Sequence, residues 1–234
     1  MLVDDMAGRP PEPSTELPPE LARLPPGRHG LPPEFVVHNQ RERLIAGLAL
    51  AVAEHGYAAT TISHITKAAA VSRRTFYEHF ESKEDCFLAA YDIVLEQIRE
   101  RVVAAAETED EWPQRIRAGI GTLLGFFASE PDLARLGMVE SFVAGPRIAE
   151  RHREAIESFI PLLRLARVGL LDDHEVDALP DTTEDAIVGG MALLIARRVV
   201  AGRAAELEQL LPDLVLFALT PYIGAKEAER IAAG

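Results

Sequence analysis

The stretch Thr61–Lys83, TISHITKAAAVSRRTFYEHFESK, decides the fold, because it predicts two short helices joined by a tight turn. Thr61 and Ser72 each stand where the N-cap residue of a helix belongs, since their hydroxyls can accept a hydrogen bond from a free backbone N–H. Phe76 and Phe80 lie four residues apart and share the inner face of the second helix. The outer face is basic and rich in hydroxyl groups, which suits a helix that enters the major groove of DNA.

A longer segment extends this pattern. VSRRTFYEHFESKEDCFLAAYD, preceded by GYAATTISHITKAAA, resembles the DNA-binding head of the tetracycline-repressor (TetR-like) family. The resemblance runs from about Gln40 to Tyr91, and its motifs are G-Y, T-T-I and V-S-x-x-T-F-Y-x-H-F-x-S-K-E. It implies a homodimer that binds a near-palindromic operator in double-stranded DNA, and a helical body that binds a small-molecule effector.

Eight residues are the expected DNA contacts. Five are carried over by position from the family: Thr61, Thr75, Tyr77, His79 and Lys83. The other three come from the turn and the outer face of the second helix: Ser72, Arg73 and Arg74. Lys83 matches the family's basic residue at the start of the next helix, and a helix N-terminus is itself a phosphate site. Arg73 and Arg74 can each read a guanine edge, worth ~1–3 kcal/mol of discrimination, or contact a phosphate. The sequence leaves both roles open.

Two residues depart from the family's pattern. Ala70 replaces the usual glycine before V-S, so a left-handed turn there would cost roughly 1–2 kcal/mol, unless the preceding helix ends differently. Glu78 is expected on the outward face, where it would repel phosphates or accept a hydrogen bond from a cytosine amino group. Both bear on fine geometry and leave the resemblance intact.

The charge of the chain is unevenly distributed. The net charge of −13 divides into −3 for residues 1–38, zero for residues 39–91 and −10 for residues 92–234. An acidic body would favour docking of the neutral head on DNA, although it serves solubility equally well. Cys86 is the single cysteine, which fits a reducing cytoplasm, and it is expected to be a core residue. No apolar run reaches the ~20 residues of a membrane span, so we expect a cytoplasmic protein with no membrane partner.

Residues 1–38 hold nine of the 16 prolines and predict a largely disordered arm. Arg28 and His29 lie shortly before the first predicted helix. They could reach the minor groove of DNA, where arginine is attracted by the negative potential. The alternative is a passive tail.

The fold predicted is all-α: a three-helix helix-turn-helix head in residues 39–91 and a C-terminal helical domain in residues 92–234 for effector binding and dimerisation. Helices are expected over 39–55, 61–69, 73–80, 83–107, 112–129, 132–143, 147–171, 182–201, 207–219 and 224–232. Pro161 should kink the 147–171 helix. Thr182 and Asp185 predict a capping box at the start of the 182–201 helix.

Large side chains of the body are the candidates for an effector pocket: Trp112, Phe126, Met138, Phe142, Phe159 and Met191. Each could equally be ordinary core. Two apolar stripes are candidates for the dimer face: Ile187, Met191, Leu194 and Ile195, and then Leu210, Leu214 and Phe217. Either stripe could instead be buried within its own subunit.

Motifs of enzymes are absent: the sequence has no H-E-x-x-H, C-x-x-C or G-x-S-x-G. We therefore predict no catalytic residues, no metal ligands and no cofactor, and we expect His152 to be solvated. The predicted function is a DNA-binding transcriptional regulator, a repressor released from its operator by a small-molecule effector. The alternatives are a helical ligand-binding protein or enzyme whose head has lost DNA binding, or an activator of the same fold.

Overall fold

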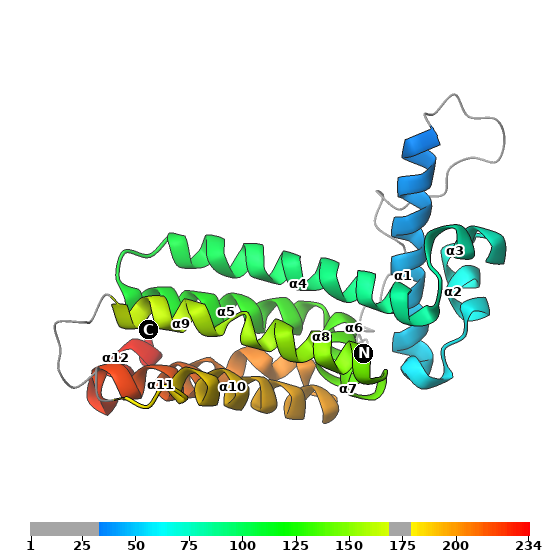
Figure 1. Ribbon diagram of the computed structural model, residues 1–234. Coiled ribbons are helices and arrows are strands. Elements are labelled where there is room, and N and C mark those ends of the chain that lie inside the picture. Colours follow the sequence, from blue (N-terminus) through cyan, green and yellow to red (C-terminus); the bar gives the residue numbers. More distant parts are fainter. Residues whose placement is uncertain (1–32, 169–178) are drawn as a thin grey trace, which may run out of the picture.

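The computed structural model describes residues 33–168 and 179–234, and within these ranges the protein is helical with no strand. A small head stands across one end of an elongated body (Figure 1). The head and its link to the body are formed by α1 (Pro33–Ala59), α2 (Ile62–Ala69), α3 (Arg73–His79) and α4 (Lys83–Glu107). The α4 helix starts in the head and runs along the body, as Figure 1 shows. The all-α prediction is confirmed for these residues.

The body is a bundle in which α4 packs along α5, and α5 packs in turn on the C-terminal helices. Its elements are α5 (Trp112–Ser129), α6 (Pro131–Arg135), the π-helical turn η2 (Leu136–Glu140), α7 (Ser141–Val143), α8 (Pro146–Glu157), α9 (Ile160–Val168), α10 (Thr183–Val200), the 3₁₀ helix η4 (Ala204–Leu210), α11 (Leu211–Ile223) and α12 (Ala225–Ala233).

Three helix starts carry side-chain caps, two of them at the predicted residues Thr61 and Ser72. The Thr61 hydroxyl accepts the His64 N–H at 3.2 Å, and the Ser72 hydroxyl accepts the Thr75 N–H at 3.0 Å. The Ser82 hydroxyl accepts a backbone N–H at the start of α4, at 3.1 Å. Each cap satisfies one of the backbone donors that a helix N-terminus leaves free.

Other boundaries differ from the predictions. The first helix begins at Pro33, ahead of the expected start, because proline is well suited to the first turn of a helix. The single helix expected over 147–171 is two helices, α8 and α9, with Pro161 in the first turn of α9, where its missing N–H is tolerated. The prediction of a capping box at Thr182 is wrong. The backbone of Thr182 (φ −90°, ψ 6°) is not extended, and its side chain accepts no hydrogen bond from the first turn of α10.

Two residues of α1 that carried no motif organise the head. A Cβ added at Gly47 would lie 2.8 Å from the Ile65 carbonyl oxygen, so glycine permits the close crossing of α1 and α2. Arg43 is buried, and its guanidinium donates to the carbonyl oxygens of Ala69 and, at 2.9 Å, Ala70. The turn between α2 and α3 is therefore held from α1.

The head is joined to the body by more than the chain. Its hydrophobic core continues into body side chains, including Leu136 and Ile148. The buried Glu140 of η2 accepts the Tyr57 N–H through Oε2 at 2.9 Å, and the Arg135 guanidinium through Oε1 at 3.1 Å. A charge-assisted bond therefore connects η2 to the end of the first head helix.

Candidate nucleic-acid interface and ligand cavity

The outer face of α3 is built as the sequence predicted. Phe76 is fully buried beneath the helix, while Arg73, Arg74 and Tyr77 are exposed. Tyr77 is 54% exposed, and its ring meets the edge of the Phe76 ring at 5.5 Å between centroids. The contact with Phe76 therefore supports the Tyr77 ring from one side, and the hydroxyl can point away from the head.

Charge on this face is partly neutralised. The Arg74 guanidinium pairs with the Glu78 carboxylate four residues on, at 3.0 Å, and both side chains are exposed. The carboxylate that was expected to repel phosphates is therefore matched by a neighbouring cation. Within the described ranges Arg73 has no ion-pair partner, which leaves its guanidinium available to a ligand.

The turn that sets the angle between α2 and α3 has a left-handed residue. Ala70 has φ 51° and ψ 45°, and it is the one non-glycine residue with positive φ in the described ranges. The Val71 N–H bonds the Thr66 carbonyl at 3.0 Å, which closes the turn as in a Schellman motif. Of the two alternatives that the sequence left open at this position, the structure has the left-handed turn, with alanine in place of glycine.

Lys83 is held inside the head. Its ammonium donates to the carbonyl oxygens of Tyr57 at 2.7 Å and Thr60 at 2.8 Å, and it lies 4.1 Å from the centre of the Tyr57 ring. Burial lowers the pKa of this amino group. The side chain therefore closes the carbonyl end of α1, and a direct phosphate contact by Lys83 stays a prediction.

The remaining predicted DNA contacts have local roles. Thr61, Ser72 and Thr75 take part in capping, with 2.9 Å between the hydroxyls of Ser72 and Thr75. His79 is half-buried, and burial followed by the charge of Arg41 lowers its pKa. The two arm residues, Arg28 and His29, lie outside the described residues.

A cavity of about 530 Å³ lies in the body between α4, α5, α8, α9, α10 and η2. The apolar part of its lining on α4 extends from Tyr91 to Ala106, about 22 Å at the rise of an α-helix. Its lining is mostly aliphatic and aromatic. Four of the predicted effector residues line it: Trp112, Met138, Phe159 and Met191.

Two predicted effector residues lie outside the lining. Phe126 is buried under the Arg101 guanidinium, 5.0 Å from its ring centre, and the next residue, Phe127, faces the cavity instead. Phe142 comes after the π-helical turn and is 60% exposed. An extra residue in a helical turn rotates every later side chain, and a regular 3.6-residue period does not account for that rotation.

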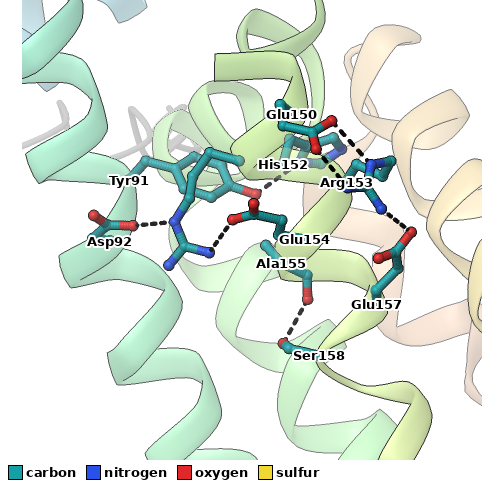
Figure 2. Close-up of polar contacts among 10 residues, drawn as sticks. Tyr91, Asp92, Glu150, His152, Arg153, Glu154, Ala155, Glu157 and Ser158 are labelled. Atoms are coloured by element: carbon teal, nitrogen blue, oxygen red, sulfur yellow. Dashed lines mark hydrogen bonds and ion pairs between the residues drawn. The ribbon is translucent and has the colours of Figure 1, made fainter. Parts of the chain in front are cut away.

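The cavity end nearest the head carries a buried polar pair. The Tyr91 hydroxyl of α4 lies 2.7 Å from Nδ1 of His152 on α8, as Figure 2 shows. His152 is only 2% exposed, so its expected solvation is wrong. Burial lowers the pKa of His152 to about 4 and raises that of Tyr91. Both side chains are neutral near pH 7.

The predicted dimer stripes divide between core and surface. Five of the residues face inward: Ile187, Ile195, Leu210 and Leu214 are buried, and Met191 lines the cavity. Leu194 and Phe217 are exposed, together with two residues that were not predicted, Leu193 and Val200. Phe217 lies over Gly190, where an added Cβ would be 3.1 Å from its ring. The exposed apolar face therefore belongs to the outer side of α10 with Phe217.

Within residues 33–168 and 179–234 no cluster of His, Cys, Asp or Glu is arranged to hold a metal ion. In the same ranges no helix combines the length and apolarity needed to cross a membrane. Cys86 is fully buried, and burial raises the pKa of its thiol to about 12, as expected for a core residue.

A short exposed helix, set by a capped turn and backed by a buried aromatic, defines the head as a helix-turn-helix DNA-binding module. Residues 45–90 match the family profile described as "Bacterial regulatory proteins, tetR family". The head of the chain is therefore similar to the DNA-binding domain of these regulators.

Similar proteins among those compared are also transcriptional regulators. The chain is 29% identical over 202 residues to the HTH-type transcriptional regulator EthR of Mycolicibacterium smegmatis, covering 85% of this chain and 89% of that one. It is 26% identical over 119 residues to the transcriptional activator FasR of the same species, covering 51% and 54%. The fold matches that of the regulator FadR of Bacillus subtilis, crystallised with stearoyl-CoA, with a TM-score of 0.67 at 18% identity over 78% and 98% of the two chains.

Proposed function

We propose that the protein is a dimeric repressor whose operator affinity is lowered when a small molecule fills the body cavity. The observation that supports this best is the position of η2. Its residues Gly137 and Met138 line the cavity, and its last residue, Glu140, bonds the Tyr57 N–H of the head. A ligand that displaces η2 would therefore act on the head through a buried bond.

The π-helical geometry suits such a role. An inserted residue loosens the hydrogen-bond ladder, and π-bulges in α-helices occur often at functional sites. The Ser141 hydroxyl bonds the Gly137 carbonyl at 2.7 Å, which supplies a partner to an acceptor inside this irregular turn. A ligand shifts the equilibrium only if it binds one head arrangement more tightly than the other. In this proposal the ligand-filled state holds the two α3 helices at a spacing that no longer fits adjacent major grooves.

Dimerisation would use the exposed face of α10, with Leu193, Val200 and Phe217 covered by the second subunit. Leu193 is 62% exposed and Val200 is 70% exposed. The Leu193→Glu variant should become monomeric by light scattering and lose affinity for a two-site operator. A variant that remains dimeric would reject this face.

The protein would act by binding and without catalysis, and in the cytoplasm, where bacterial DNA lies. Activation is the second candidate, because the matching half of the chain resembles an activator as well. A reporter fused to the promoter beside the protein's own gene separates the two: deletion of the regulator should raise expression under repression and lower it under activation.

DNA binding is tested by fluorescence anisotropy with DNA fragments from beside the gene. We expect Tyr77→Ala to weaken binding at least tenfold, since it removes an outward hydroxyl of α3 while Phe76 keeps the core. Arg99→Ala, which removes an exposed cation of the body, is the matched control and should bind normally. Absence of DNA binding by the wild type at low salt would overturn the proposal.

A further inference from the structure

The two ends of the cavity differ in exposure. Near the head its lining residues are buried, among them Tyr91, Met138 and His152. Three of the lining residues are exposed, Glu107, Asp110 and Arg115, and all belong to the turn between α4 and α5 or to the helix ends beside it. The exposed part of the lining, and with it the opening of the cavity, therefore lies at the end of α4 that is farther from the head. Figure 1 shows where this end of α4 lies.

The described residues of the interior offer no charge to a ligand. Between the opening and the closed end the described lining is apolar apart from the neutral pair of Tyr91 and His152. A volume of about 530 Å³ spread over about 22 Å is long and narrow. Such a shape suits an extended apolar chain that enters at the opening and leaves its polar end there.

The opening is acidic. The carboxylates of Glu107 and Asp110 line it against one cation, Arg115, whose Nε donates to the Glu109 carbonyl at 2.7 Å. The side chains of Glu109 and Glu111 add two further negative charges to the same turn.

One cation of a neighbouring helix and one aromatic ring also lie near the opening. Arg230 of α12, which feels the charge of Glu111, is already paired with Glu227 of its own helix. The Trp112 ring also lines the cavity here and packs edge-on against Tyr222. Carboxylates beside an indole face attract a cation and repel an anion.

We propose that the cavity binds a single-chain amphiphile with a cationic head group, such as a long alkylammonium, and discriminates against the fatty carboxylate or acyl-CoA of the same chain. This rests on the proposed role of the cavity as the effector site. The apolar tail would fill the cavity between α4 and α8, and the ammonium group would remain between Glu107, Asp110 and the Trp112 ring.

Trp112 is the only tryptophan of the chain, so its fluorescence reports on this opening alone. The probes are dodecyltrimethylammonium, dodecanol and dodecanoate, each titrated below its micellar concentration at low ionic strength. We expect Kd to increase in that order. The Kd of dodecanoate should exceed that of dodecyltrimethylammonium roughly tenfold. Each of the two exposed carboxylates modestly attracts the cationic head group and modestly repels the anionic one. High salt should reduce the ratio of the two Kd values, because it screens the exposed carboxylates.

Paired variants identify the charges responsible. The double variant Glu107→Gln with Asp110→Asn should bind the cation and the anion with nearly equal Kd, while dodecanol is unaffected. Glu100→Gln is the control, since Glu100 is exposed on the same helix and does not line the cavity. It should retain the wild-type ratio.

Dodecanoate binding as tightly as dodecyltrimethylammonium would overturn the head-group preference while leaving the cavity as an effector site. A tenfold preference that survives in the double variant would also overturn it. If none of the three chains binds, both the preference and the proposed effector site fail.

Discussion

Substitution of Ala70 by glycine should stabilise the protein. The residue is left-handed at φ 51°, and an L-residue with a Cβ is disfavoured there by roughly 1–2 kcal/mol. The side chain is exposed, so its removal forfeits little packing. Two hydrogen bonds of the turn do not involve the methyl group and should persist: the Arg43 guanidinium donates to the Ala70 carbonyl, and the Val71 N–H donates to the Thr66 carbonyl.

Glycine also gives the unfolded chain more conformational freedom than alanine does. This effect favours unfolding and reduces the gain in stability by about 0.4–1 kcal/mol. Taking the middle of each range, the free energy of unfolding should rise by about 0.8 kcal/mol. For a chain of this size that corresponds to an increase of about 2–3 °C in Tm.

Urea denaturation followed by circular dichroism measures the effect as a higher midpoint at an unchanged m-value. Ala68→Gly is the matched control: the same substitution in the regular part of α2 should lower the free energy of unfolding by about 1 kcal/mol. The reasoning would be refuted by a lower midpoint for Ala70→Gly. It would also be refuted if the two variants changed the free energy of unfolding in the same direction.

Three further predictions concern buried groups. Replacing Glu140 by leucine leaves the buried Tyr57 N–H without its acceptor and should cost about 2–3 kcal/mol in urea denaturation, whereas glutamine should cost about half as much. Cys86 should resist thiol labelling in the folded protein and react on unfolding, because its thiolate is disfavoured; rapid labelling of the native state would contradict this. The folded pKa of His152, about 4, lies below its unfolded value of ~6.5, so only the unfolded chain gains a proton as the pH falls between them. Stability should drop by about 2 kcal/mol from pH 7.5 to pH 5, and His152→Gln should lack this part of the loss.

Local chemistry explains why so much of the head was predictable. The caps at Thr61 and Ser72 join residues three apart in sequence. The left-handed turn at Ala70 was one of two alternatives that the sequence left open. Partners distant in sequence left no comparable signal. Arg43 reaches a carbonyl 27 residues away, and Glu140 reaches a backbone N–H 83 residues away.

The body was less predictable because several of its helices are apolar on more than one side. On α10 the periodicity that buries Ile187 and Ile195 is accompanied by Leu193 and Val200 on the outer side, so sequence could not decide which stripe faces a second subunit. The prediction that Phe142 lines the effector pocket was wrong for a different reason, the π-helical turn before it. Its extra residue moved that side chain from the expected pocket to the surface.

The central claim, that the exposed face of α3 binds DNA, is tested most directly by the salt dependence of operator affinity. The slope of log K against log salt should be strongly negative for the wild type. Arg73→Ala should reduce its magnitude by about 0.9 for each phosphate that is no longer neutralised, or about 1.8 for a two-headed dimer. Equal affinity and equal slope for the two proteins would contradict the claim.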